Sequence, residues 1–361
     1  MARELWIDGA EISDASDCYV IAEIGHNHQG SLDECKRMFA VAKECGANAV
    51  KLQKRDNRAL YTKAMYDSPY LHRNSYGATY GEHREKLEFG RSEYEALIRH
   101  AKELGITFFS TAFDIPSADF LAALDMPAYK IASGDLTNIP LLRHVAKLGK
   151  PMIISTGGGT MEDVVRAYYT IMPLNRQLAI LQCTSGYPAE FEELNLKVIQ
   201  TFRDRFPETV IGLSSHDNGI AMALVGYVMG ARIVEKHFTL NRAAKGTDHA
   251  FSLTPEGMHR MVRDLRRARI AVGDGVKRTY ESEKGPLYKM AKALVAARDL
   301  PAGHVLTPAD LTFKSPSNGL PPYEYDNVLG MRLTTAVKAD DSIKYEILEP
   351  AEPARRVAAA Q

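Results

Sequence analysis

The chain has 361 residues, of which 45 are Lys or Arg and 45 are Asp or Glu, so its formal net charge is zero. Such a chain has no overall field that would recruit nucleic acid or an anionic membrane, and we expect neither as a partner. The N-terminal residues lack the apolar core of a signal peptide, no apolar run is long enough to cross a bilayer, and the four cysteines show no paired spacing. We therefore expect a cytoplasmic protein with reduced thiols.

Eight short apolar segments alternate with stretches of helical periodicity over residues 1–280. This alternation is typical of a parallel α/β fold, and eight repeats predict a closed (β/α)8 TIM barrel, with an open doubly wound sheet as the competing fold. Ser31 and Gly46 are expected to open and close the first helix, and Thr254 to open the last one. The expected strands are 19–23, 49–53, 107–111, 129–132, 152–155, 178–182, 210–214 and 231–236.

Two segments interrupt this rhythm. Residues 54–88 follow the second strand and are rich in Tyr, His, Arg and Asn, which predicts a lid or substrate loop at the mouth of the barrel. Residues 281–290 are expected to form a flexible linker to a small β-rich domain at 291–352, followed by a frayed tail at 353–361. The strands expected in that domain are 294–297, 311–313, 331–336 and 343–347.

Nearly every predicted barrel strand ends in a polar or ionisable side chain. Barrel enzymes carry their chemistry at these ends, and apolar residues would pack that layer better, so the set as a whole predicts an active site. Lys51 and Lys130 place two cations at the same end of the predicted barrel, and glycines 157–159 precede a helix. Together these features favour a small, doubly anionic substrate such as phosphoenolpyruvate. Any one of these residues, taken alone, is as well explained by a structural role.

His216 and His237 close the seventh and eighth predicted strands, which are neighbours in a barrel. Their imidazoles can converge on one divalent cation, and two nitrogen ligands completed by water and substrate oxygens suit Mn²⁺ better than Mg²⁺. The alternative is a pair of hydrogen-bonding histidines that line the pocket. The roles of three further histidines are left open. His26, His28 and His249 either orient substrate or are ordinary loop residues.

The strand ends form an ordered series of motifs that runs nearly from end to end: IAEIGHNHQGS (21–31), VKLQK (50–54), FFSTAFD (108–114), AYKIASGD (128–135), IISTGG (153–158), LQCTSGYP (181–188), IGLSSH (211–216), EKHFTL (235–240) and KGTDHAFSLTPEG (245–257). This series resembles the sialic acid synthase family of phosphoenolpyruvate-dependent nonulosonic acid synthases. VAARDLPAGHVLTPADL (295–311) is similar to the antifreeze-like, or SAF, domain of that family.

The resemblance implies a transferase that joins phosphoenolpyruvate to an open-chain amino-sugar aldose, working as a homodimer in which the SAF domain caps the active site of the partner. It also implies a role for each matching residue. Lys51, Thr111, Lys130, Ser133, Ser155, Ser185 and Ser214 match positions that hold phosphoenolpyruvate. His216 and His237 match ligands of Mn²⁺, with Mg²⁺ or Co²⁺ as alternatives. Gln53, Asp135, Tyr187 and Asp248 match contacts to the sugar, and Glu23 matches a carboxylate that assists proton transfer; Glu23, Lys51, Lys130 and Asp135 form the expected catalytic set.

The acceptor sugar is left open. Asp135, Ser185, Ser215 and Ser315 depart from the bacterial enzymes that use free N-acetylmannosamine, and the SGD, QCTS and TYGEH motifs instead resemble animal synthases that use the 6-phosphate. A deaminated, legionaminic-type or pseudaminic-type product is an alternative, as is a non-catalytic sugar-binding protein. The basic residues of the insertion either meet a sugar phosphate or form a solvated loop: Lys54, Arg55, Arg58, His72, Arg73, His83 and Arg84.

Overall fold

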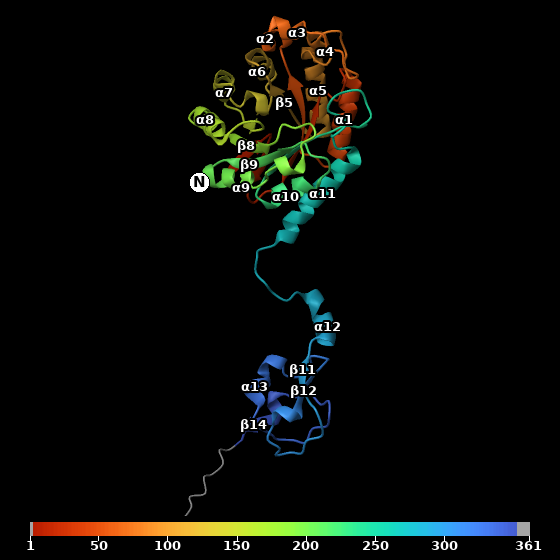
Figure 1. Cartoon of the computed structure of the whole chain (residues 1–361), viewed down its shortest axis with the longest axis vertical. Coiled ribbons are helices and arrows are strands. Elements are labelled where there is room, and N and C mark those ends of the chain that lie inside the picture. The colour runs from red at the N-terminus through yellow and green to blue at the C-terminus, as the bar shows by residue number, and fades with distance from the viewer. Residues whose placement is uncertain (1–2, 352–361) are drawn as a thin grey trace, which may run out of the picture. The chain divides into compact units, whose positions relative to one another are not determined.

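The computed structural model describes residues 3–351 and divides the chain into two compact units, with the boundary between Gly273 and Asp274. The first unit is a closed barrel of eight parallel strands with helices around it (Figure 1). The TIM barrel predicted from the sequence is therefore confirmed, and the open sheet is excluded. The barrel strands are β3 (Tyr19–Gly25), β4 (Ala49–Lys54), β5 (Thr107–Ala112), β6 (Tyr129–Ile131), β7 (Met152–Ser155), β8 (Leu178–Cys183), β9 (Val210–Ser215) and β10 (Ile233–His237).

Eight longer helices follow the strands, and three of the helix ends predicted from the sequence are confirmed. The Ser31 hydroxyl accepts the backbone N–H of Glu34 at the first turn of α1, and Gly46 takes a positive φ of 87° just past its end. The Thr254 hydroxyl caps the last helix of the barrel in the same way. These helices are α1 (Leu32–Glu44), α5 (Arg91–Leu104), α6 (Ile115–Ala122), α7 (Ile139–Ala146), α8 (Met161–Ile171), α9 (Val198–Arg205), α10 (Ala221–Val228) and α11 (Pro255–Val272). No helix within residues 3–351 combines the length and apolarity that a membrane span requires.

The interior of the barrel changes from apolar to polar along the strands. Ile21, Phe109 and Ile233 belong to one buried apolar cluster inside the barrel. Alternate side chains of a strand face inward, so the next inward position on each strand lies two residues further along. On β3, β5 and β10 this position is occupied by a polar residue. A hairpin of β1 (Glu4–Ile7) and β2 (Ala10–Ser13) adds to the same apolar cluster. This hairpin was not predicted, because four-residue strands carry too little periodicity.

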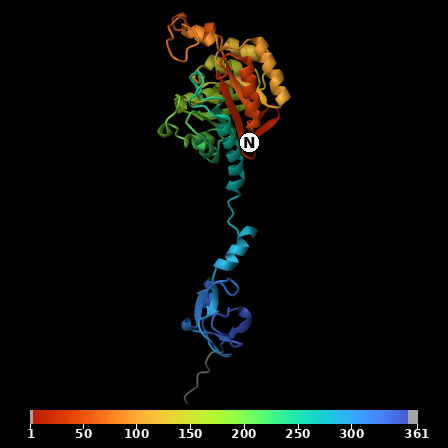
Figure 2. The ribbon, with the colours of Figure 1, turned by 90° about the vertical axis from the view of Figure 1, so that its right-hand side faces the viewer.

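The insertion after β4 is ordered. It contains three short helices, α2 (Asn57–Leu60), α3 (Lys63–Tyr66) and α4 (Tyr80–Glu85), and lies at one end of the barrel unit (orange in Figure 2). The aromatic rings of Tyr70, Tyr80 and His83 pack against one another, with centroids 4.7 Å apart for Tyr70 and His83. The Tyr76 hydroxyl donates a 2.6 Å hydrogen bond to the carbonyl of Lys245, which ties the insertion to the loop after β10.

The second unit contains a helix at the position where the sequence predicts a linker, residues 281–290. Helix α12 (Glu281–Met290) starts where the Glu283 carboxylate accepts the backbone N–H of Tyr280 at 2.7 Å, and it continues through Pro286. The segment 343–347, predicted as a strand, is instead a loop and a 3-10 turn, because Met331–Leu333 pairs with the residues just after it. The remaining elements are the antiparallel pairs β11 (Ala293–Ala296) with β12 (Leu311–Lys314) and β13 (Met331–Leu333) with β14 (Leu348–Pro350), and α13 (Tyr325–Val328). The predicted tail at 353–361 lies outside the described residues.

A fully buried carboxylate holds the turns of this unit together. Asp310 accepts hydrogen bonds from the Arg298 guanidinium (2.7 Å), the His304 ring (2.9 Å) and both the backbone and hydroxyl of Thr307 (2.9 and 2.6 Å). Burial alone would raise the pKa of Asp310, but these donors outweigh it and hold the pKa well below its usual range. The folded unit therefore favours the ionised carboxylate.

We expect Asp310→Asn to lower the free energy of unfolding of this unit by about 1–3 kcal/mol, because charged partners lose their acceptor. Since the folded pKa lies below the unfolded one, the stabilisation is present above the unfolded pKa and is lost as pH falls through the acid range. Urea unfolding of the wild type and the variant at pH 7 and pH 3 measures both effects. If the wild type and Asp310→Asn had the same free energy of unfolding at pH 7, this account of Asp310 would be wrong.

Candidate active site

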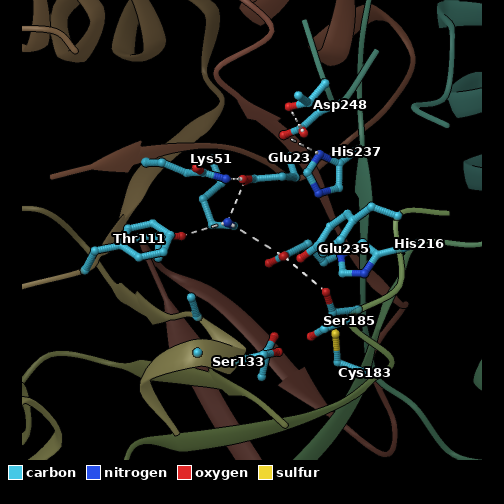
Figure 3. Close-up of a pocket in the computed structure, with 18 of the residues that line it drawn as sticks. Glu23, Lys51, Thr111, Ser133, Cys183, Ser185, His216, Glu235, His237 and Asp248 are labelled. Atoms are coloured by element: carbon cyan, nitrogen blue, oxygen red, sulfur yellow. Dashed lines mark hydrogen bonds and ion pairs between the residues drawn. The ribbon is translucent and has the colours of Figure 1, made fainter. Parts of the chain in front are cut away.

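A cavity of about 730 Å³ opens at the C-terminal end of the barrel strands. All but one of the site residues predicted from the sequence line it. The exception is Asp135. Figure 3 shows how the labelled side chains of this cavity face one another. The predicted residues that line the cavity are Glu23, Lys51, Gln53, Thr111, Lys130, Ser133, Ser155, Ser185, Tyr187, Ser214, His216, His237 and Asp248.

Strand register brings the charged groups together. Glu23 on β3 lies opposite Lys51 on β4, and Thr111 on β5 lies opposite Lys130 on β6. The Lys51 ammonium is 2.5 Å from Glu23 Oε2, donates to Thr111 Oγ1 at 2.9 Å and lies 3.7 Å from Glu235 Oε1 (Figure 3). The Lys130 ammonium donates to Ser155 Oγ at 2.6 Å. Two buried lysines thus share one pocket with hydroxyl groups.

Glu235 on β10 is a carboxylate that the predicted site did not include. It is 5% exposed and accepts a hydrogen bond from Ser214 Oγ at 3.3 Å. The strand pattern contains the signal that could have identified it, because Glu235 precedes His237 by two residues and therefore faces inward with it. Burial would raise the pKa of Glu235, but Lys51 and Lys130 outweigh it and hold the pKa below its ordinary value.

Glu23 has the opposite shift. Burial, opposed by Lys51 and assisted by the charge of Glu235, raises the pKa of Glu23 above its ordinary value. The two carboxyl groups of this cavity therefore have pKa shifts of opposite sign. Glu23 also accepts a 2.7 Å hydrogen bond from the Gln53 amide.

Serine hydroxyls surround the inner end of the cavity. Ser133 Oγ accepts the backbone N–H of Gly157 at 3.0 Å, at the start of the glycine-rich turn after β7. A side chain at Gly157 would displace the hydroxyls of Ser185 and Ser133, so glycine there leaves both hydroxyls at the cavity. Hydroxyls and the Lys130 ammonium supply the donors that an anionic group needs.

His216 and His237 lie side by side, with ring centroids 5.3 Å apart. His216 Nδ1 donates to the carbonyl of Thr184 at 2.9 Å, which leaves Nε2 with a free lone pair. His237 Nδ1 is buried without a hydrogen-bond partner. Tyr187 packs against the His216 ring at 4.3 Å and Phe251 against the His237 ring at 4.9 Å, which fixes both orientations.

Burial, with the charge of the neighbouring histidine, lowers the pKa of His216 to about 3, and burial also lowers the pKa of His237. Both rings are therefore neutral at physiological pH, the form that ligates metals. Residues 3–351 contain no cluster of three or more His, Cys, Asp or Glu side chains arranged for a metal. The cavity wall offers these two adjacent imidazoles as nitrogen donors to a divalent cation.

The basic residues of the insertion divide into two groups. Lys54 pairs with Glu88 at 3.2 Å, and the exposed Arg58 stacks on Tyr66 at 3.6 Å, so neither reaches the cavity. His83 is buried among the tyrosines of the insertion. The others, which sequence reasoning left open, line the outer part of the cavity: Arg55, His72, Arg73 and Arg84.

Asp135 is the one predicted site residue that is not part of the cavity lining. It ends the 3-10 turn Ser133–Asp135 after β6, and its carboxylate accepts a 3.1 Å hydrogen bond from the Asn138 amide. Ser133 and Gly134 of the same turn do line the cavity. The role of Asp135 as a catalytic and sugar contact stays a prediction.

A model of the NeuB family matches residues 38–277, and a model of the SAF domain matches residues 291–349. The chain is 39% identical over 345 residues to the N-acetylneuraminate-9-phosphate synthase of Homo sapiens, with 95% of each chain covered. It is 36% identical to the N,N'-diacetyllegionaminic acid synthase of Legionella pneumophila, with 92% of this chain and 95% of that protein covered. The crystal structure of an N-acetylneuraminic acid synthetase from Leptospira borgpetersenii matches with a TM-score of 0.69 at 29% identity, covering 79% of this chain and 95% of that one.

Proposed function

We propose that this chain, which belongs to the NeuB family of sialic acid synthases, condenses phosphoenolpyruvate with the 6-phosphate of an N-acetylmannosamine-type aldose. The products would be N-acetylneuraminate 9-phosphate and phosphate. One observation carries the proposal: a single cavity contains an inner pair of lysines among hydroxyls and an outer group of arginines. Such a cavity fits two reactants that each bear an anionic group.

The inner lysines would bind phosphoenolpyruvate. Lys51 and Lys130 are both buried and lie beside the hydroxyls of Thr111 and Ser155, so their charges act on a bound anion with little screening by water. Holding phosphoenolpyruvate in attack geometry beside the aldehyde contributes up to roughly 7–11 kcal/mol in favourable cases.

In the proposed reaction, C3 of phosphoenolpyruvate forms a bond to the aldehyde carbon, and the aldehyde oxygen takes up a proton. Glu23 can supply that proton, because burial raises its pKa and so favours the protonated carboxyl. Water then adds to the cationic C2 and loses a proton, and phosphate leaves with cleavage of its bond to C2. Glu235, whose pKa is lowered, stays ionised and would stabilise the positive charge that develops at C2.

His216 and His237 would hold a divalent cation, with Mn²⁺ preferred and Mg²⁺ or Co²⁺ as alternatives. When bound, the cation supplies a positive charge that polarises the aldehyde oxygen. The packing of Tyr187 and Phe251 against the two rings would keep the imidazoles in place whether or not substrate is present.

The outer arginines support a phosphorylated acceptor. Arg55, Arg73 and Arg84 line the cavity on the side of the insertion, and guanidinium groups bind phosphate through paired hydrogen bonds. The three carbons of phosphoenolpyruvate precede the sugar chain, so C6 of the acceptor becomes C9 of the product. The name of the human relative, N-acetylneuraminate-9-phosphate synthase, agrees with this acceptor.

Mass spectrometry of the product, made from phosphoenolpyruvate and either free or 6-phosphorylated N-acetylmannosamine, tests the proposal. We expect the 9-phosphate product, and a kcat/KM for the phosphorylated acceptor about 100-fold higher, which corresponds to about 2.7 kcal/mol. Preference for the free sugar would contradict the phosphate half of the proposal. Phosphate release only with the aldose precursor of a legionaminic-type acid would favour the function of the Legionella relative, and sugar binding without any phosphate release would favour a non-catalytic protein.

A homodimer and a cytoplasmic location complete the proposal. Leu287 and Met290 of α12 and Phe313 of β12 are large apolar side chains that are 44–65% exposed within this chain. An SAF domain that covers the active site of a partner would bury such side chains.

A further inference from the structure

Three segments of the barrel mouth meet at the side chain of His26. His26 follows β3, Arg55 follows β4, and Arg84 lies on α4 at the far end of the insertion. The His26 side chain is 9% exposed. The ring therefore lies where the insertion returns to the barrel.

Both ring nitrogens of His26 face charged groups. Nε2 lies 3.3 Å from an Arg55 guanidinium nitrogen and 3.4 Å from Glu88 Oε1, while Nδ1 lies 3.5 Å from an Arg84 guanidinium nitrogen. Burial first, and then the two arginines, lower the pKa of His26 well below its usual value, so the ring is neutral. A neutral imidazole presents one N–H and one lone pair.

Either arginine can donate to the ring. In one tautomer Nε2 carries the lone pair and accepts from Arg55 at 3.3 Å, and in the other Nδ1 carries it and accepts from Arg84 at 3.5 Å. Glu88 Oε1, a buried carboxylate oxygen without a hydrogen-bond partner, lies 3.4 Å from Nε2. Glu88 Oε2 accepts the backbone N–H of Arg55 at 3.2 Å, which also ties the two ends of the insertion together.

The two guanidinium groups have few other acceptors. Arg55 is 7% exposed, stacks over Phe113 at 3.7 Å and donates to Gln53 at 2.8 Å, while its Nε has no partner. Within residues 3–351, the hydrogen-bond partners of Arg84 are the hydroxyl of Tyr80 and Nδ1 of His26, the latter at 3.5 Å. Two cations held near one histidine at the edge of a cavity form a place for an anionic group.

We propose that His26, together with Glu88, is a positioning residue that aims Arg55 and Arg84 at one anionic group of the acceptor and so sets the selectivity of the cavity for a phosphorylated aldose. This inference rests on the proposed function. The plainer interpretation is a histidine that only fills space beneath the insertion. That interpretation leaves unexplained why both ring nitrogens face charged groups.

The test compares His26→Leu with His26→Gln, whose amide still offers one donor and one acceptor. Arg58→Leu is the matched control, because Arg58 lies on the same insertion but outside the cavity. The readout is the ratio of kcat/KM for 6-phosphorylated over free N-acetylmannosamine, with KM for phosphoenolpyruvate measured alongside. We expect His26→Leu to lower this ratio at least about 10-fold through KM of the phosphorylated acceptor, while KM for phosphoenolpyruvate changes less than about twofold. His26→Gln should retain most of the ratio.

A mutant cycle separates positioning from packing. If His26 acts by positioning Arg55 and Arg84, adding His26→Leu to a variant that carries both Arg55→Leu and Arg84→Leu should lower the ratio less than about twofold further. Glu88→Gln, which preserves side-chain size, should lower the ratio as well and replaces His26→Leu if that variant does not fold. A wild-type enzyme without preference for the phosphorylated sugar would overturn both this inference and the proposed acceptor. If the preference for the phosphorylated sugar persists in His26→Leu and Glu88→Gln, this inference is wrong while the proposed acceptor stands.

Discussion

Lys130→Ala is expected to reduce kcat by about 10³-fold, the range seen when one charge-stabilising donor is removed from an active site. The Lys130 ammonium is buried, donates to Ser155 and to a backbone carbonyl, and has room for an anion beside it. Its loss would leave phosphoenolpyruvate with Lys51 as the only inner ammonium on the cavity wall. Initial rates of phosphate release at saturating phosphoenolpyruvate measure the effect.

The fold should survive this change. Glu235, which Lys130 helps to keep ionised, retains Lys51 at 3.7 Å as a compensating charge. A thermal unfolding curve and far-UV circular dichroism should therefore stay close to those of the wild type. Lys147→Ala, an exposed lysine at the end of α7, is the matched control. Substantial turnover of Lys130→Ala at saturating substrate would remove this lysine from the mechanism.

The barrel and the inner site could be predicted because both follow from local patterns. Apolar runs alternating with helical periodicity define the strands, and the parallel order then places Lys51, Lys130, His216 and His237 at one mouth. The same reasoning included Asp135, which is not part of the cavity lining, because the sequence does not reveal that a 3-10 turn follows β6.

The outer site could not be predicted from such patterns. Whether Arg55 and Arg84 are solvated depends on how the insertion packs, and that packing is set by contacts distant in sequence, such as Tyr76 with Lys245 and His26 with Glu88. Helix α12 was not predicted, for a different reason. Gly285 and Pro286 are typical of a helix break, and the sequence does not show that Glu283 caps the first turn.

Removal of divalent metal is expected to stop product formation completely, and added Mn²⁺ to restore it. This prediction depends on the neutral imidazoles of His216 and His237. The first is oriented by the Thr184 carbonyl, and Nδ1 of the second is buried without a hydrogen-bond partner, 3.8 Å from Asp248 Oδ2. The enzyme is treated with a chelator and dialysed, and phosphate release is then followed as Mn²⁺, Co²⁺ or Mg²⁺ is added. Full activity of the metal-stripped enzyme would refute the two-histidine site.

Binding measurements locate the metal independently of turnover. His216→Ala and His237→Ala should each weaken Mn²⁺ binding, followed by isothermal titration, by at least about 100-fold, because each removes one of only two ligands from this chain. His144→Ala is the control, since His144 lies on α7 and pairs with Asp119 outside the cavity. If both variants bound Mn²⁺ as tightly as the wild type but lost turnover, the two rings would act as hydrogen-bonding groups, the alternative that their spacing in the sequence left open.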